Sequence, residues 1–282
     1  MFKIIYKIFY LILILITFQA FDFNSSSKFK YEQIISKAKI EKWENCEIGD
    51  LIGKIALEFI GTPYLANTLE YEPESCIINF NGFDCVTFVE NTFNLARMIK
   101  KKVYCYDTLL NYITFTRYRN GVLTDYTSRL HYTSEWIMDN QRKGVLTDIT
   151  KEFGGESIKF NVFYMSKNSE KYKALKIHPE YVTIIAKIEE KINNETFYYI
   201  PKNKILSIED KFKTGDIVAF VTDIEGLDYS HIGIIFVDKN GTARLLHASS
   251  KHKKVILDEK LSKYINSIKN DIGITILRAT GK

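Results

Sequence analysis

The sequence predicts an α+β domain in which helices come first and an antiparallel sheet comes last. Apolar residues recur at helical spacing in several segments between residues 28 and 100. The last seventy residues instead hold short runs rich in β-branched residues, several of them separated by turn residues. Residues 21–282 are expected to form one domain, because the sequence has four prolines and no Pro/Gly/Ser-rich linker or internal repeat.

Residues 1–20 differ from the rest and predict export. The segment MFKIIYKIFYLILILITFQA has a basic start, an apolar run and a terminal alanine, as in a secretory signal. The apolar run is shorter than the roughly 20 residues of a membrane span. Phe18 is a poor residue at the third position before a cut after Ala20, so an uncleaved membrane anchor stays open. Either way, residues 21–282 are expected outside the cytoplasm, in the periplasm or outside the cell.

The composition indicates a globular protein without a nucleic-acid partner. Hydrophobic residues make up 46% of the chain and aromatic residues 14%, which is enough for a substantial core. The formal net charge is +5, and residues 1–20 contribute two of these charges through Lys3 and Lys7. The remaining excess of positive charge is too small to favour binding to nucleic acid.

Two helical patterns precede the strands. The first covers residues 28–60 and is best defined in IGDLIGKIALEFIG, after which Gly61 and Pro63 end it. The second is expected from Asp84, a good N-cap residue, to about Lys100. Its buried face is expected to consist of Val86, Val89, Phe93 and Ala96.

The middle of the chain is mixed and the end is strand-rich. Between residues 105 and 210, TLLNYITFTRYRNG and SRLHYTSEWIMDNQRKG predict helical pieces, and the remainder predicts short strands and loops. Five strands are expected from GDIVAFVTD, HIGIIFVD, TARLLHASS, KKVIL and GITILRA. Adjacent strands with short turns favour antiparallel pairing.

Cys85 lies where the second helix begins, in NGFDCVTFVE. A small buried core residue is one interpretation, since free cysteine is often buried. A nucleophile is the other, because the N–H groups and partial positive charge of a helix N-terminus lower a thiol pKa and can stabilise an oxyanion.

His231 and His247 are the histidines best placed to assist a cysteine nucleophile. His231 opens the strand HIGIIFVD, and His247 lies on the next strand, LLHASS. Both are about eight residues from the turn at Lys239-Asn240-Gly241, so we expect them to meet across the hairpin. His247 would then hydrogen-bond the far nitrogen of His231 and fix its tautomer.

The motifs FDCVTFVE, SHIGIIF and LLHASS together resemble the NlpC/P60 superfamily of papain-like thiol hydrolases. More specifically, GTPYLANTLE, RYRNGV, SRLHYTSEWIMDN, FKTGDIVAF and GLDYSHIGI resemble the DUF1460 branch, over roughly residues 45–280. The resemblance implies a papain-like core in which the nucleophile helix packs on the antiparallel sheet, with helical additions. Many relatives have Ser-Gly after the Asp-Cys pair, where this chain has Val86 and Thr87.

The resemblance also implies a function. It predicts an N-acetylmuramoyl-L-alanine amidase that acts on peptidoglycan fragments without a cofactor. The anhydro form of the sugar is expected, and the reducing form stays open. Cys85 would be the nucleophile, His231 the base and then the acid, and His247 the orienting residue. Among the polar residues, Tyr64, Glu70, Arg129, His131 and Ser230 are expected to bind substrate. Arg129 and His131 would hold a peptide carboxylate, whereas a structural ion pair between Arg129 and Glu70 is the alternative.

Three rival functions stay open. The same catalytic residues would serve an endopeptidase that cuts between D-glutamate and a diamino acid, or a thiol acyltransferase. A non-catalytic wall-binding protein is the third, although the intact Cys85, His231 and His247 argue against it. The sequence has no ligand spacing typical of a zinc site. Cys46, Cys76 and Cys105 have no visible chemistry, and pairing among them is left open.

Overall fold

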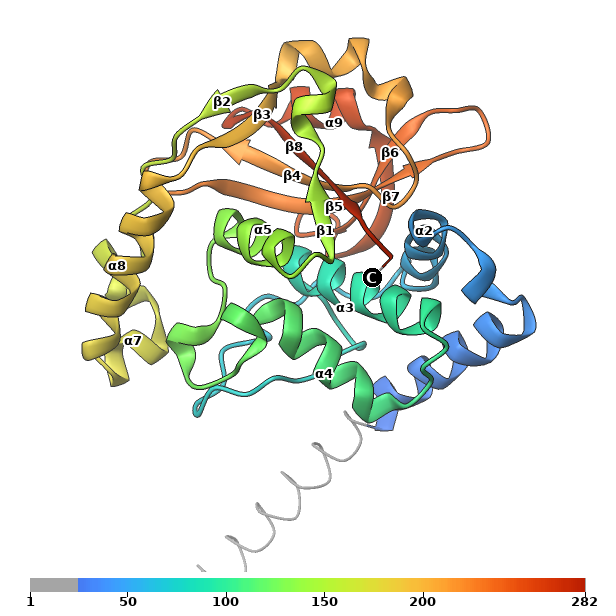
Figure 1. Cartoon of the computed structure of the whole chain (residues 1–282), viewed down its shortest axis with the longest axis horizontal. Coiled ribbons are helices and arrows are strands. Elements are labelled where there is room, and N and C mark those ends of the chain that lie inside the picture. Colours follow the sequence, from blue (N-terminus) through green and yellow to red (C-terminus); the bar gives the residue numbers. More distant parts are fainter. Residues whose placement is uncertain (1–24, 282) are drawn as a thin grey trace, which may run out of the picture.

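The computed structural model describes residues 25–281, so the predicted signal or anchor in residues 1–20 lies outside the described residues. Helices come first and most strands come last (Figure 1). Residues 25–40 are helical, and the labelled α-helices are α2 (Ile48–Glu58), α3 (Cys85–Lys100), α4 (Tyr106–Arg117), α5 (Thr133–Arg142), α6 (Tyr164–Lys167), α7 (Lys173–Ile177), α8 (Glu180–Asn194) and α9 (Leu261–Ser267). The strands are β1 (Leu146–Asp148), β2 (Glu156–Ile158), β3 (Phe197–Pro201), β4 (Ile217–Thr222), β5 (Tyr229–Val237), β6 (Ala243–Ser249), β7 (Lys254–Lys260) and β8 (Asp271–Ala279).

The strands form one antiparallel sheet, which confirms the predicted α+β class. Their order is β2-β3-β8-β4-β5-β6-β7, and β1 also pairs with β8. All pairings are antiparallel. The five strands predicted from the C-terminal runs are β4 to β8, and β4 to β7 lie side by side in sequence order.

Helices cover both faces of the sheet. Along β4, Ile217 and Ala219 point into the larger core cluster, whereas Val218 and Phe220 point into the smaller one. This alternation is the period of a strand buried on both faces. Helices α2 to α5 lie on the side of the larger cluster and α9 lies on the opposite side (Figure 1).

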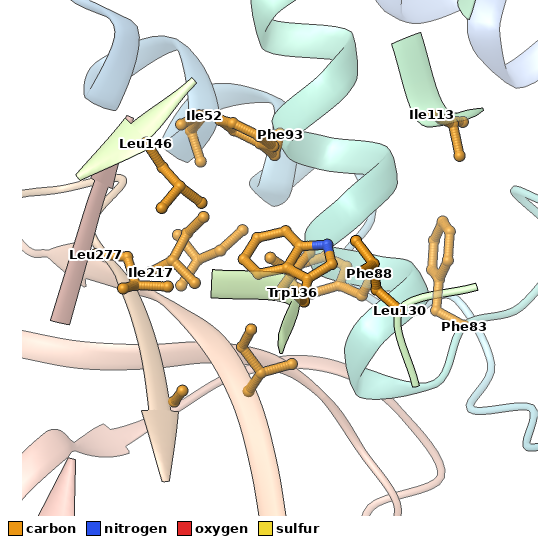
Figure 2. Packing of buried hydrophobic residues seen from close by; sticks show 14 of the residues in the cluster. Ile52, Phe83, Phe88, Phe93, Ile113, Leu130, Trp136, Leu146, Ile217 and Leu277 are labelled. Atoms are coloured by element: carbon orange, nitrogen blue, oxygen red, sulfur yellow. The ribbon is translucent and has the colours of Figure 1, made fainter. Parts of the chain in front are cut away.

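The larger core joins the helices to the sheet. Figure 2 shows Phe88 and Phe93 of α3 and Trp136 of α5 gathered with Ile217 and Leu277 of the sheet. Phe93 and Trp136 pack edge to face, with ring centroids 6.5 Å apart. The predicted packing of the helix that begins at Cys85 against the antiparallel sheet is therefore present.

Helix α3 is buried on every side and not on one face only. All residues from Thr87 to Ile99 are buried, whereas Val86, which was expected in the core, is 37% exposed. The polar residues of α3 consequently need partners inside the protein. Glu90 accepts a hydrogen bond from Nε of Arg117 on α4 at 2.8 Å, and both side chains are almost completely buried.

The helical pattern over residues 28–60 is not one helix. The helix over residues 25–40 stops before Lys42, which has a left-handed backbone (φ 53°), and α2 begins at Ile48. Between them the 3₁₀ turn Trp43–Asn45 places Trp43 in the core, 1% exposed. Lys42 and this turn therefore divide the helical pattern into two helices.

Helix α8 was not predicted, because residues 180–194 fell within the region expected to hold short strands and loops. The β-branched run from Val182 to Ile185 resembles a strand. Helical spacing prevails because Ile185, Ile188 and Ile192 share one buried face. The predicted helical piece in residues 128–144 is helical only from Thr133, as α5.

Residues 25–281 hold no disulfide, no helix that could span a membrane and no cluster of metal-binding side chains. Cys46, Cys76, Cys85 and Cys105 are all free, so none of the open disulfide pairings is formed. No helix within residues 25–281 is long and apolar enough to cross a membrane. Within the same residues, no group of three or more His, Cys, Asp or Glu side chains is arranged to hold a metal ion.

The buried ion pair gives a test of the fold. We expect Glu90→Ala to lower the free energy of unfolding by about 3–5 kcal/mol, because it leaves the Arg117 charge buried without its partner. Urea unfolding measures the change. Glu156→Gln is the control, since the Glu156–Lys204 pair is about half exposed and should contribute little. A similar small change for Glu90→Ala would contradict the importance of the buried pair.

Candidate active site

Cys85 is the first residue of α3, and its neighbours fix that position. The Asp84 carboxylate accepts a hydrogen bond from the Thr87 main-chain N–H at 2.7 Å. The Thr87 hydroxyl accepts one from the Asp84 N–H at 3.0 Å, so the two residues form a capping box. Thr87, which departs from the Ser-Gly pattern of many relatives, therefore has a structural function here.

The surroundings of Cys85 favour the neutral form of its thiol. Desolvation raises its pKa to about 12, and the Asp84 charge adds to this effect. Hydrogen bonds from the main-chain N–H groups of Ile232, Val86 and Cys85 act in the opposite direction but are weaker. The helix N-terminus was expected to lower the pKa of this thiol, but burial outweighs the helix dipole and the pKa is raised instead.

His231 lies at the start of β5, next to a β-bulge. Phe220 pairs with His231 but Val221 pairs with Tyr229, so Ser230 is the extra residue. The His231 ring packs beside Phe220, with ring centroids 5.6 Å apart. Burial, followed by the neighbouring His247, lowers the pKa of His231 to about 3. Cys85 and His231 are therefore both neutral near pH 7.

The predicted contact between His231 and His247 is present. His231 Nε2 lies 2.6 Å from His247 Nδ1. Their equal distance from the turn suggested that the two residues would lie directly opposite each other, but they do not. Ile234 pairs with Leu246, which places Gly233 opposite His247 and His231 diagonally on the same face. A Cβ on residue 233 would lie 3.1 Å from the His247 Cβ, so glycine leaves room for this approach.

Sequence reasoning missed two residues behind His231. His247 Nε2 lies 3.2 Å from Asp258 Oδ2 on β7, which extends the hydrogen-bonded series beyond the two histidines. Tyr264 of α9 covers His247 edge-on, with centroids 5.2 Å apart. The charged residue Asp258 inside the strand run KVILDEK could have been noticed in the sequence. Its contact with His247 could not, because that contact depends on how β6 pairs with β7.

Cys85 and His231 open into one cavity of about 240 Å³. Of the residues expected to bind substrate, Glu70, His131 and Ser230 line it, together with Asp228. The remaining lining residues are Val86, Tyr126, Tyr132, Thr133, Met165, Tyr172, Leu227, Tyr229 and Ile232. A larger cavity of about 410 Å³ between α5 and α8 contains no cysteine or histidine among its lining residues in the described chain.

Tyr64 and Arg129 are not among the residues that line this cavity. Tyr64 is half-buried, and burial, with smaller effects from the Cys85 and Asp84 charges, raises its pKa. Arg129 is 5% exposed and donates to Glu70 Oε1 at 2.7 Å and to the Leu69 carbonyl at 2.6 Å. The structural ion pair with Glu70 is thus the alternative that forms, and Arg129 does not face a substrate carboxylate.

His131 and Ser230 have defined partners at the cavity wall. His131 Nε2 lies 2.8 Å from the Tyr126 carbonyl, which can only accept, so this nitrogen carries the hydrogen. Burial and then the Arg129 charge lower the pKa of His131 well below its ordinary value, so the ring is neutral and offers no charge to a carboxylate. The Ser230 hydroxyl donates to Asp271 Oδ1 at 2.5 Å.

Comparisons with known proteins identify the family of the chain. A family model described as AmiA-like, N-acetylmuramoyl-L-alanine amidase-like, matches residues 54–274. A crystal structure of an N-acetylmuramoyl-L-alanine amidase from Bacteroides uniformis is 33% identical, with a TM-score of 0.78 over 83% of this chain and 99% of that one. A Bacteroides fragilis structure described as a putative xylanase is 39% identical, with a TM-score of 0.75 over 80% of this chain and 99% of that one.

A more distant structure shares the fold. A Legionella pneumophila protein of the DUF1460 family model is 22% identical, with a TM-score of 0.68 over 91% of this chain and 95% of that one. A search of curated proteins gave no match. The family model covers most of the chain, and membership of this family implies a substrate related to peptidoglycan. The chain therefore belongs to the AmiA-like, N-acetylmuramoyl-L-alanine amidase-like family and is an amidase-like hydrolase.

Proposed function

We propose that the protein is a cysteine amidase of the NlpC/P60 type that cuts between anhydro-N-acetylmuramic acid and L-alanine in peptidoglycan fragments. One observation carries the proposal: in a chain of this amidase-like family, Cys85 at a helix N-terminus and His231 line the same cavity. The composition of residues 1–20 supports action outside the cytoplasm.

The neutral Cys85 and His231 favour general-base activation of the thiol. His231 accepts the Cys85 proton as the sulfur attacks the amide carbonyl carbon. Main-chain N–H groups at the start of α3 hold the oxyanion that forms in this step. The C–N bond then breaks, protonated His231 gives its proton to the amine, and a peptide with a free N-terminal alanine leaves.

The second half-reaction releases the sugar. The thioester joins Cys85 to the lactyl group of the muramic acid. Water attacks this carbonyl and gives a proton to His231, and the C–S bond breaks. The proton returns to the sulfur, which restores the neutral pair. No cofactor enters either step.

The charge of the cavity favours a substrate with an ammonium group on its peptide. Glu70 and Asp228 are the only residues with a formal charge among those that line it in the described chain, because His131 is neutral. Both oxygens of Asp228 accept main-chain N–H groups, from Ser134 and Tyr229. Glu70 is 30% exposed and is held by Arg129 through one oxygen, so we assign the ammonium of a diamino acid to Glu70.

Two other activities are less well supported. A glycosidase of the usual kind needs two carboxyl groups that flank a sugar bond. Asp228 is buried and its oxygens are occupied, and such an enzyme would leave Cys85 and His231 unexplained. An endopeptidase would use the same catalytic residues, and Glu70 would then bind the free amine of N-terminal alanine. The products distinguish this activity from the amidase.

Cys85→Ala should abolish hydrolysis of a defined anhydro-muropeptide, because no other group in the cavity can form the thioester. The expected wild-type products, read by mass spectrometry, are the anhydro-sugar and the intact peptide. Cys105→Ala, an exposed cysteine, is the matched control and should stay active. Cleavage inside the peptide would support the endopeptidase, and full activity of Cys85→Ala would reject the cysteine mechanism.

Glu70→Gln should lower kcat/KM by about tenfold for a muropeptide whose diamino acid has a free side-chain amine. For a substrate in which that amine is acetylated, kcat/KM of the variant should barely change. The acetylated amine carries no charge, so it has no ionic interaction with Glu70 to lose. Glu72→Gln, on the same loop but outside the cavity lining, is the control. Equal losses on both substrates would show that Glu70 does not recognise the ammonium.

The pH dependence tests the neutral resting state. Because the pKa of His231 is lowered to about 3, this base stays unprotonated as pH falls from 7 to 5. We therefore expect kcat/KM, which reports the free enzyme, to stay level across this range. Circular dichroism at each pH checks that the protein stays folded. A fall centred near pH 6.5 would mean that His231 titrates at its ordinary pKa.

A further inference from the structure

Asp258 stands at the end of a series of two hydrogen bonds that begins at His231. His231 Nε2 and His247 Nδ1 are 2.6 Å apart, and His247 Nε2 and Asp258 Oδ2 are 3.2 Å apart. His247 is 1% exposed, so its two ring nitrogens depend on these neighbours for their hydrogen bonds. The importance of this series for catalysis rests on the proposed function, in which His231 is the base.

The chemistry of the three groups sets the direction of both bonds. A carboxylate only accepts, so the hydrogen of neutral His247 lies on Nε2, facing Asp258. His247 Nδ1 is then bare and accepts a hydrogen bond. His231 Nε2 must therefore carry the hydrogen of that neutral ring, which leaves His231 Nδ1 bare. A bare nitrogen is what a base needs in order to take the Cys85 proton.

A bulge in β7 holds Asp258 in this position. Arg244 pairs with Lys260 and Leu246 with Leu257, so Asp258 and Glu259 together lie opposite Leu245. The Glu259 main-chain N–H donates to Asp258 Oδ1 at 2.7 Å. The Asp258 carbonyl accepts from Arg244 Nε at 2.8 Å. One carboxylate oxygen is thus fixed by the bulge and the other faces His247.

We infer that Asp258 is a positioning residue that fixes the tautomers of both histidines and so keeps His231 Nδ1 free to act as the base. The inference distinguishes two substitutions of similar size. In Asp258→Asn the Glu259 N–H retains the side-chain oxygen, so the NH₂ group faces His247 and donates to it. Every hydrogen in the series then reverses, and His231 Nδ1 carries a hydrogen. In Asp258→Ala no side-chain group faces His247, so neither direction of the hydrogen bonds is imposed.

The test measures tautomers and activity on the full chain. Two-bond ¹H–¹⁵N NMR spectra of histidine-labelled protein report which nitrogen of each ring carries the hydrogen. We expect His231 to carry it on Nε2 in the wild type and on Nδ1 in Asp258→Asn. In muropeptide hydrolysis, kcat of Asp258→Asn should fall by about a hundredfold with little change in KM. Asp258→Ala should lose less activity.

Each result decides the inference. Glu259→Gln, whose side chain pairs with Lys263 at the surface, is the matched control and should keep the wild-type tautomers and rate. An unchanged His231 tautomer in Asp258→Asn, or equal losses in Asp258→Asn and Asp258→Ala, would overturn the role of Asp258. Absence of muropeptide cleavage by the wild type would count against the proposed function only, since the NMR spectra need no substrate.

Discussion

The active site depends on where α3 begins. The capping box of Asp84 and Thr87 fixes Cys85 as the first helical residue, so the main-chain N–H groups of Cys85 and Val86 lie beside the sulfur. The orientation of the Cys85 side chain depends on this start, because each residue of a helix turns the side chain by about 100°. Because α3 is buried along nearly its whole length, its packing against the sheet and the neighbouring helices fixes this orientation.

Burial determines the chemistry of the site as well as its geometry. Desolvation raises the pKa of Cys85 and lowers that of His231, so both are neutral near pH 7. In a pair of neutral histidines the hydrogen bonds can run in either direction. A neighbouring group that only accepts or only donates hydrogen bonds sets that direction. The carboxylate of Asp258 supplies that direction from the third strand of the β5-β6-β7 unit.

The substrate side of the cavity is built from segments far apart in the chain. Glu70 comes from the long loop before α3, and Tyr126 and His131 come from the segment between α4 and α5. Asp228 immediately precedes β5. Arg129 joins the first two of these segments through Glu70. The ion pair that joins these loops therefore also holds Glu70, one of the two acidic residues that line the cavity.

Three features could be predicted from the sequence: the order of helices and strands, the helix start at Cys85 and the pairing of His231 with His247. These features rest on local rules: capping, side-chain period and the near-symmetry of a hairpin. Three others follow from the folded arrangement: the neutral state of the thiol, the inward pairing of Arg129 and the contact of Asp258 with His247. Burial and strand register depend on residues distant in sequence, so no local pattern could reveal them. The same reason explains α8, where packing of one isoleucine face prevailed over a strand-like composition.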